Sequence, residues 1–163
     1  MIQRVQTLLL AGVVILMIAG IFVPSWEKHQ ADTGELATLD ALALTHLQPA
    51  EGGEDFITNV AAQTWYIALL CALAAGIAAF EIFQFNNRLL QMKLGAFNSL
   101  VIAGVVVAVM LLSRQGEALF DPMVVGKYQA GFYLPMAAIF MNIVANRFIQ
   151  RDERLVRSMD RLR

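Results

Sequence analysis

The chain has 163 residues, of which 58% are hydrophobic and 15% are charged, and its formal net charge is −1. A soluble globular domain has about 25% charged residues and a smaller apolar share, so the composition argues against a water-soluble enzyme. Disorder is excluded too, because disordered chains combine low hydrophobicity with high net charge. The one cysteine cannot form a disulfide within the chain.

Four long segments contain no charged residue and predict four membrane spans. They are Val5–Trp26, Phe56–Phe80, Leu94–Ser113 and Tyr128–Asn146. A bilayer core about 30 Å thick needs roughly 20 apolar residues of α-helix, and none of the runs has the polar face of a soluble amphipathic helix. We predict an all-α membrane protein with a single membrane domain over 1–163. It is an antiparallel bundle of four transmembrane helices at about 5–25, 60–82, 94–113 and 130–149.

The first run has an alternative interpretation as a cleaved signal peptide. Arg4 precedes the run, and Ala19 and Gly20 are small residues near a possible cleavage point. The apolar run continues past that point through Val23, which favours a span over a signal peptide.

The basic residues are distributed unevenly between the two predicted sides of the membrane. Nine of the twelve lie in the N-terminus, the loop 81–93 and the C-terminal tail, and these three segments share one side. Lys and Arg mark cytoplasmic segments, so we expect a multi-pass protein of the inner (plasma) membrane with both termini in the cytoplasm. Counted by side, the formal charge is +5 inside and −6 outside. The aromatic residues expected at the outer interface are Trp26, Trp65, Tyr66, Tyr128, Phe132 and Tyr133.

Two segments outside the spans carry a structural prediction, and only the first is long enough to fold outside the membrane. The acidic outer loop 27–59 alternates over Ala41–His46, which favours short strands, although Leu36, Leu39 and Leu47 also allow a helical turn or two. The cytoplasmic tail 150–163 predicts an amphipathic helix that lies along anionic lipid headgroups. The arginines predicted to contact lipid or a protein partner are Arg147, Arg151, Arg154, Arg157, Arg161 and Arg163.

The spans contain few polar residues that could do chemistry. We interpret Glu81, at the inner end of the second span, as an interface residue rather than a proton carrier. The intramembrane polar residues are Asn98, Ser99, Asn142 and Asn146, whose side chains more often join helices than bind a substrate. They are nevertheless the best internal place for a polar ligand.

No motif for catalysis, metal binding or nucleotide binding occurs in the sequence. We expect His29 and His46 to be surface residues of the outer loop and Cys71 to be a packing residue. We therefore expect no enzyme activity and no cofactor. We also expect no nucleic-acid partner, because the basic tail lies next to the membrane.

Small residues recur every four positions in two of the predicted spans. They are Ala68, Ala72 and Gly76 in the second, with Ala75 and Ala79 beside them, and Gly104 and Ala108 in the third. Such spacing lets helices approach closely, so these faces are expected to hold the bundle together. The alternative is that one of them binds another membrane protein. Pro135 lies either at the start of the fourth helix or at a kink within it.

Three stretches resemble a known protein family. They are Met1–Thr7, Asn87–Leu94 and Arg151–Arg163, and the last is the most specific. They are similar to a family of small four-span membrane proteins found in Bacteroidota and classed as a domain of unknown function. The resemblance implies an inner-membrane location and one domain, and it assigns no activity. All three stretches fall on the predicted cytoplasmic side, which makes that side the expected working surface.

Three functions remain open from the sequence. The first is a non-enzymatic scaffold or accessory subunit of a membrane complex, in contact through the arginine-rich tail. The second is a small transporter or carrier that uses the region of Asn98, Asn142 and Asn146. The third is a membrane sensor whose acidic outer loop binds a ligand, for which the carboxylates would have to cluster.

Overall fold

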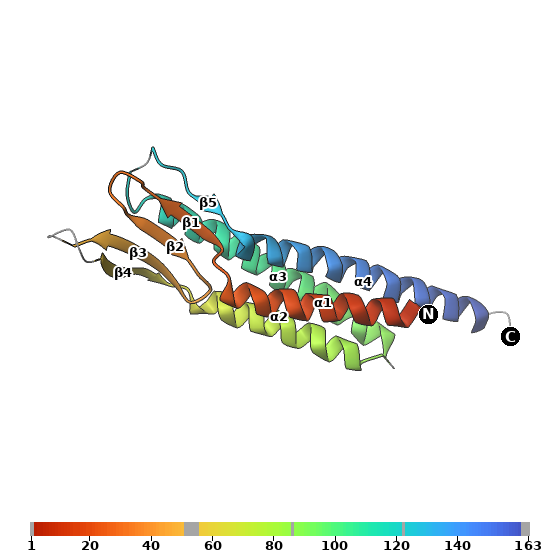
Figure 1. Ribbon diagram of the computed structural model, residues 1–163. Helices are drawn as coiled ribbons and strands as arrows, with labels where there is room; N and C mark the ends of the chain where they lie inside the picture. The colour runs from red at the N-terminus through yellow and green to blue at the C-terminus, as the bar shows by residue number, and fades with distance from the viewer. Residues whose placement is uncertain (1, 51–55, 86, 122, 161–163) are drawn as a thin grey trace.

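The structure is a computed structural model in which four long helices lie side by side and a small sheet covers one end (Figure 1). It describes residues 2–50, 56–85, 87–121 and 123–160, and side chains between 5 and 154 within these ranges. The helices are α1 (Ile2–Phe22), α2 (Trp65–Phe83), α3 (Arg88–Glu117) and α4 (Ala130–Asp160). All four are long and apolar enough to cross a membrane. The four predicted helices are confirmed.

The all-α class is wrong, because the chain also forms a five-stranded antiparallel sheet. Its strands are β1 (Trp26–His29), β2 (Leu36–Leu39), β3 (Ala43–Pro49), β4 (Phe56–Gln63) and β5 (Lys127–Tyr128), in the spatial order β4-β3-β2-β1-β5. The short strands favoured in the outer loop are thus confirmed. Between β1 and β2 the chain turns at Gly34, whose φ of 74° favours glycine.

The sheet buries one face against the end of α3, and alternation along the strands decides which residues face inward. Trp26 and Lys28 in β1 are buried, whereas the residues between and after them are more exposed. In the strand register, Ala37 lies between Lys28 and His46, so these three residues form a row across one face. The buried apolar residues of the sheet and of the helices form one continuous hydrophobic core.

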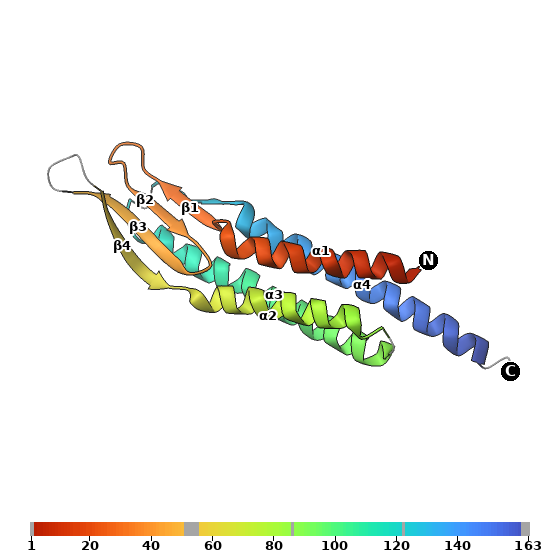
Figure 2. The same cartoon turned by 60° about the horizontal axis from the view of Figure 1, so that its bottom comes forward.

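Both chain termini lie at the end of the bundle opposite the sheet, together with the turn between α2 and α3 (Figures 1 and 2). We call this the terminal end and the other the sheet end. The antiparallel threading predicted from the sequence brings the same three segments together. α4 projects beyond the other helices at the terminal end (Figure 2).

Several predicted boundaries differ from the helices observed. The second helix begins at Trp65 instead of about residue 60, because residues 56–63 pair with β3 as strand β4. α3 and α4 have 30 and 31 residues, so at 1.5 Å per residue each is about 45 Å long, more than a bilayer core of about 30 Å. α3 is longer than predicted at both ends and reaches the sheet, where its contacts with β1 and β2 stabilise the extra turns. Pro135 lies within α4.

The tail is not a separate helix. α4 continues without a break through residue 160, so the segment from 150 follows the axis of the fourth helix instead of turning along the membrane surface. Asp152, in the first turn of this segment, is held by Arg88 at 3.7 Å and by Gln6 at 3.3 Å. These contacts fix the direction of the helix where the sequence predicted a change.

The small-residue faces contribute to the packing of the bundle only in part. Ala75 is buried, and Ala68 and Ala108 pack against the core, but the two glycines do not. A Cβ atom added at Gly76 or Gly104 would meet nothing within 4 Å, and Ala72 is exposed as well. The buried face of α2 consists of Ile67, Cys71, Ala74, Ala75, Ala78 and Glu81. Small apolar residues can face lipid at little cost, so their spacing alone does not decide which side of a helix is packed.

Two residues of the sheet are more buried than the sequence suggested. Trp26 is a core residue instead of an interface residue, and its ring packs closely against Gly116 and Gly126. His46 is buried and stacks on Phe120 with ring centroids 5.1 Å apart. Both belong to the inner face of the sheet, whose position over α3 only the tertiary structure determines. His29 is exposed, as predicted.

Candidate functional site

Polar side chains from α2, α3 and α4 meet inside the bundle towards the terminal end. Helical spacing places each set on one face: Gln91, Gly95 and Asn98 in α3, and Asn142 and Asn146 in α4. Glu81 of α2 extends the buried face formed by Ala74 and Ala78. We call Glu81, Asn98, Ser99, Asn142 and Asn146 the carboxyl–amide cluster.

Gly95 lies at the centre of this cluster. The Nδ2 atom of Asn142 donates to the Gly95 carbonyl oxygen at 2.7 Å and to Ser99 Oγ at 2.9 Å. The position of a Cβ on Gly95 would be 2.8 Å from Glu81 Oε1 and 3.2 Å from Asn146 Nδ2. The absence of a side chain at Gly95 therefore lets the carboxyl of α2 and an amide of α4 come together against α3.

The interpretation of Glu81 as an interface residue is wrong, because its exposed fraction is 0%. Its backbone oxygen accepts a hydrogen bond from Gln91 Nε2 at 3.1 Å, but neither carboxyl oxygen has a partner among the described residues. None of the ion pairs found in the described part of the chain reaches Glu81. A carboxyl group is costly to bury without a partner, and ionisable residues inside membrane proteins mark functional sites.

The predicted intramembrane polar residues divide into two groups. Asn142 and Asn146 join α4 to α3, the latter by donating to the Met92 carbonyl oxygen at 3.3 Å. Ser99 donates to the Gly95 carbonyl oxygen at 3.1 Å. Asn98 is also 0% exposed, yet its amide has no partner in the described part of the chain. Helix joining therefore explains three of the four side chains and leaves Asn98 unexplained.

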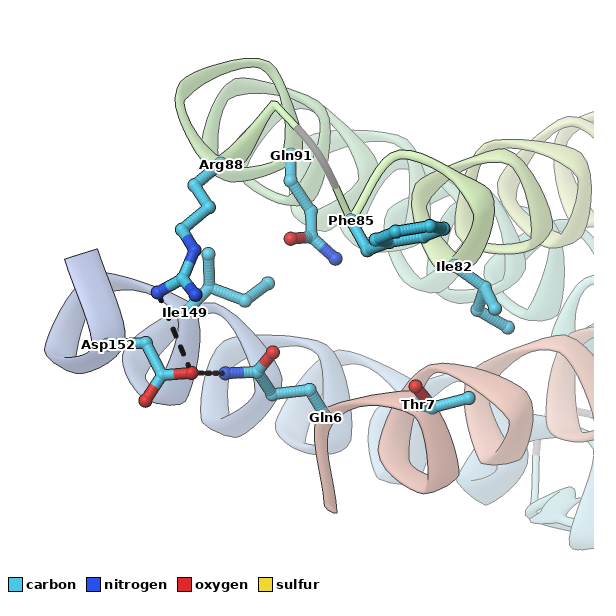
Figure 3. Close-up of a pocket in the computed structure, with 8 residues that line it drawn as sticks. All are labelled: Gln6, Thr7, Ile82, Phe85, Arg88, Gln91, Ile149 and Asp152. Atoms are coloured by element: carbon cyan, nitrogen blue, oxygen red, sulfur yellow. Dashed lines mark hydrogen bonds and ion pairs between the residues drawn. The ribbon is translucent and has the colours of Figure 1, made fainter. Parts of the chain in front are cut away.

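A cavity of about 140 Å³ lies next to the cluster at the terminal end (Figure 3). Residues from all four helices and from the turn between α2 and α3 line it: Gln6, Thr7, Ile82, Phe85, Arg88, Gln91, Ile149 and Asp152. In Figure 3, Arg88 and Asp152 face each other from α3 and α4, and Gln91 points into the cavity beside this pair. Gln91 thus lines the cavity and also bonds to the backbone of Glu81.

The sequence did not identify Glu81, Gly95 and Gln91 as parts of one site. A signal was present in the helical periodicity, because Glu81 follows Ala74 and Ala78 by seven and three residues, and Gln91 precedes Gly95 and Asn98 by four and seven. Each pattern places polar and small residues on one helical face. The periodicity does not show that these two helical faces oppose each other.

The predicted lipid- or partner-contacting arginines that the structure describes lie in the last part of α4. Arg147, Arg151 and Arg154 are exposed. The side chain of Arg157 and the whole of Arg161 and Arg163 lie outside the described residues. The three described arginines are thus free to contact a surface beyond the bundle.

The sheet end contains its own buried charge. Lys28 Nζ donates to the carbonyl oxygens of Glu117 and Phe120 at 2.7 and 3.0 Å and lies 3.5 Å from Glu117 Oε2. It also lies 4.6 Å from the centre of the Phe120 ring. These contacts satisfy the ammonium group and fix the sheet to the end of α3. Nearby, burial raises the pKa of Asp40 above its ordinary value of 3.8.

The described residues contain no group of three or more His, Cys, Asp or Glu side chains that could hold a metal ion. The carboxylates of the outer loop therefore do not cluster where the structure describes them; Glu51, Glu54 and Asp55 lie outside the described residues. The sensor function gains no support from this geometry.

Comparison with known proteins assigns the chain to a family. The family model for a domain of unknown function, DUF4293, matches residues 2–162, and the chain belongs to this family. None of the curated proteins matches the chain. The resemblance noted in the sequence is confirmed, and the family assigns no activity to the site.

Proposed function

We propose that this DUF4293 member is a non-enzymatic carrier of the inner membrane that binds a small ion at the carboxyl–amide cluster. Its termini are in the cytoplasm in this proposal, because nine of the twelve basic residues lie in segments at the terminal end. The terminal end is then the cytoplasmic end, and the sheet lies on the outer side.

One observation supports the carrier function most directly, namely the complete burial of Glu81 with both carboxyl oxygens unpartnered. A packing role would be served better by an apolar residue, since burial of an unsatisfied polar group costs about 1–3 kcal/mol. A bound solute that pairs with the carboxyl group offsets this cost. Asn98, equally buried and unpartnered, lies one helical turn from Gly95 and extends the same polar surface.

The surroundings of the cluster favour access from the terminal end. On that side, Gln91 separates the cluster from the cavity lined by Arg88 and Asp152. On the other side the bundle core is apolar, with Val13, Met17, Ile67, Cys71, Ile102, Val105 and Val109 all buried. In this structure a solute would therefore exchange with the cytoplasmic side, and transport would need a second conformation that opens the apolar half.

The test is ion and proton flux into liposomes that contain the purified protein. We expect flux driven by a membrane potential in the wild type and its loss in Glu81→Gln, which keeps the size of the side chain and removes the ionisable group. The matched control is Asp32→Asn, a carboxyl replacement in the exposed turn between β1 and β2. Equal flux in wild type and Glu81→Gln for protons and for alkali cations would show that the chain is not a carrier of this kind.

Scaffolding through the C-terminal arginines is the second candidate. It is favoured by the projection of α4 past the bundle with Arg147, Arg151 and Arg154 exposed (Figure 2). Anionic lipid headgroups or an acidic surface of another membrane protein would complement this charge, at about 1 kcal/mol for each arginine near an anionic surface. The test compares proteins retained with the intact chain and with a chain truncated after Ile149. If both retain the same partners, the tail is not the contact.

A further inference from the structure

The unpartnered atoms of the carboxyl–amide cluster are mostly hydrogen-bond acceptors. Glu81, Asn98, Asn142 and Asn146 together leave five buried oxygens and one buried nitrogen without a partner among the described residues. The nitrogen is Nδ2 of Asn98. The interior of the cluster therefore contains several oxygen atoms that can accept a hydrogen bond or bind a cation. None of them accepts a hydrogen bond from the described residues.

Neighbouring carbonyl groups fix the orientation of two of the amides. Nδ2 of Asn142 faces the Gly95 carbonyl oxygen and Nδ2 of Asn146 faces the Met92 carbonyl oxygen. A carbonyl oxygen accepts and never donates, so turning either amide over would place two acceptors against each other. The Oδ1 atoms must therefore point away from these carbonyls, and both are buried without a partner.

This arrangement selects the charge of a ligand. An anion would face five acceptor oxygens, two of them in the Glu81 carboxyl group, against the Asn98 amide and the second N–H of Asn146 as donors. A cation would be attracted by the same atoms. Carboxylate and amide oxygens are also the ligands that hard metal ions prefer, whereas the softer transition metals take histidine and cysteine.

We infer that the solute bound at the carboxyl–amide cluster is a monovalent alkali cation, with sodium as the probe. This inference rests on the proposed carrier function, and it specifies its ligand. One positive charge matches the one carboxylate, Glu81, so the occupied site is neutral inside the membrane. A proton on Glu81 also neutralises the charge, but it provides a single donor to a site that leaves several oxygens unpartnered. A metal ion contacts several oxygens at once.

Glu81 and Asn146 both approach the same point of α3. Glu81 Oε1 lies 2.8 Å and Asn146 Nδ2 lies 3.2 Å from the position of a Cβ on Gly95. Asn142 precedes Asn146 by one turn of α4, and Asn98 follows Gly95 by one turn of α3. These two amides are therefore placed to complete the ligand set from the apolar side. A cation coming from the cavity passes Gln91 first.

The experiment measures the reaction of Glu81 with dicyclohexylcarbodiimide, an apolar reagent that modifies protonated carboxyl groups within membranes. Labelling of the purified protein in detergent is followed by mass spectrometry, with sodium varied at a fixed pH and, in a second series, pH varied without sodium. We expect sodium chloride to slow the reaction and N-methyl-D-glucamine chloride at the same concentration to leave it unchanged. Glu81→Gln removes the labelled site and identifies the signal.

Two asparagine variants test the amide ligands. Asn98→Ala breaks no hydrogen bond of the described structure, and we expect it to raise the sodium concentration needed for half protection about tenfold, as loss of one good ligand would. Asn59→Ala, in β4 and exposed, is the matched control and should protect like the wild type. Equal protection in Asn98→Ala and Asn59→Ala would remove Asn98 from the site.

Two results would overturn the cation inference. If only a rise in pH slows the labelling and sodium has no effect, the site takes a proton; the carrier proposal then still stands on the flux of protons. If the reagent does not label Glu81, equilibrium binding of radioactive sodium decides, and equal binding by wild type and Glu81→Gln excludes the cation. Sodium protection without any Glu81-dependent flux would instead refute the carrier function and keep the cation site.

Discussion

Replacing Gly95 by alanine probes the contact between α2, α3 and α4 on which the candidate site depends. The new Cβ would lie 2.8 Å from Glu81 Oε1, whereas ordinary contacts begin at 3.4 Å. The carboxyl group must therefore retreat by about 0.6 Å, and Asn146, at 3.2 Å, must move as well. Overpacking of this kind typically costs about 1–3 kcal/mol.

The same substitution at Gly104 is the matched control. Both glycines are in α3, but a Cβ at Gly104 meets nothing within 4 Å. Each Gly→Ala change gains about 0.5–1 kcal/mol of helix stability, so this gain cancels when the two variants are compared. We expect Gly95→Ala to be less stable than Gly104→Ala by the overpacking cost of about 1–3 kcal/mol.

The buried thiol of Cys71 provides the assay. Cys71 is the one cysteine of the chain and has an exposed fraction of 1%, so a fluorogenic maleimide reacts only when the bundle opens. Heating the variants in detergent gives a midpoint for each. We expect the midpoint of Gly95→Ala to fall below that of Gly104→Ala, and sodium protection of Glu81 to weaken in Gly95→Ala alone. Identical midpoints would refute the close approach of Glu81 to α3.

Two further predictions concern the sheet end. Lys28→Met keeps the apolar stem but leaves two part-buried carbonyl oxygens without their donor, so we expect a loss of about 2–4 kcal/mol in unfolding free energy. The midpoint of Cys71 labelling measures this loss; an unchanged midpoint would mean that the ammonium group does not anchor the sheet. The pKa of Asp40 is raised above 3.8 by burial. The contribution of Asp40 to the free energy of unfolding is therefore fully present at low pH and is lost as the pH rises through the folded-state pKa. Asp40→Asn should remove this loss, whereas equal pH dependence in both proteins would contradict the burial effect.

The charge-free runs predicted the helices well, because a lipid environment requires long apolar segments with internal hydrogen bonds. The length of an apolar run does not predict where each helix begins and ends. Residues 56–63 are part of an uncharged run but form β4, because pairing with β3 satisfies their backbone groups. The tail beyond 149 looked like a separate amphipathic helix, but contacts of Asp152 with Arg88 and Gln6 continue α4 along its axis.

The sequence predicted only part of the candidate site. Asn98, Ser99, Asn142 and Asn146 stand out because polar side chains are rare in apolar helices, and this can be recognised without knowing the neighbouring helices. The prediction that Glu81 is an interface residue was wrong, because its place near the end of a run suggested contact with water. Its actual environment depends on Gly95, a residue of another helix with no polar group of its own.

The sequence by itself therefore determined the number of helices, their antiparallel threading and the segments that share the terminal end, since each depends on local apolar length and charge. Only the tertiary structure decided which helix faces meet. In that arrangement Gly76 and Gly104 face outward, Trp26 is buried between the sheet and α3, and Glu81 is enclosed among amides. The physical reason is that the packed arrangement depends on the faces of all the helices together. Inside a membrane, an apolar face is almost equally stable against lipid and against protein.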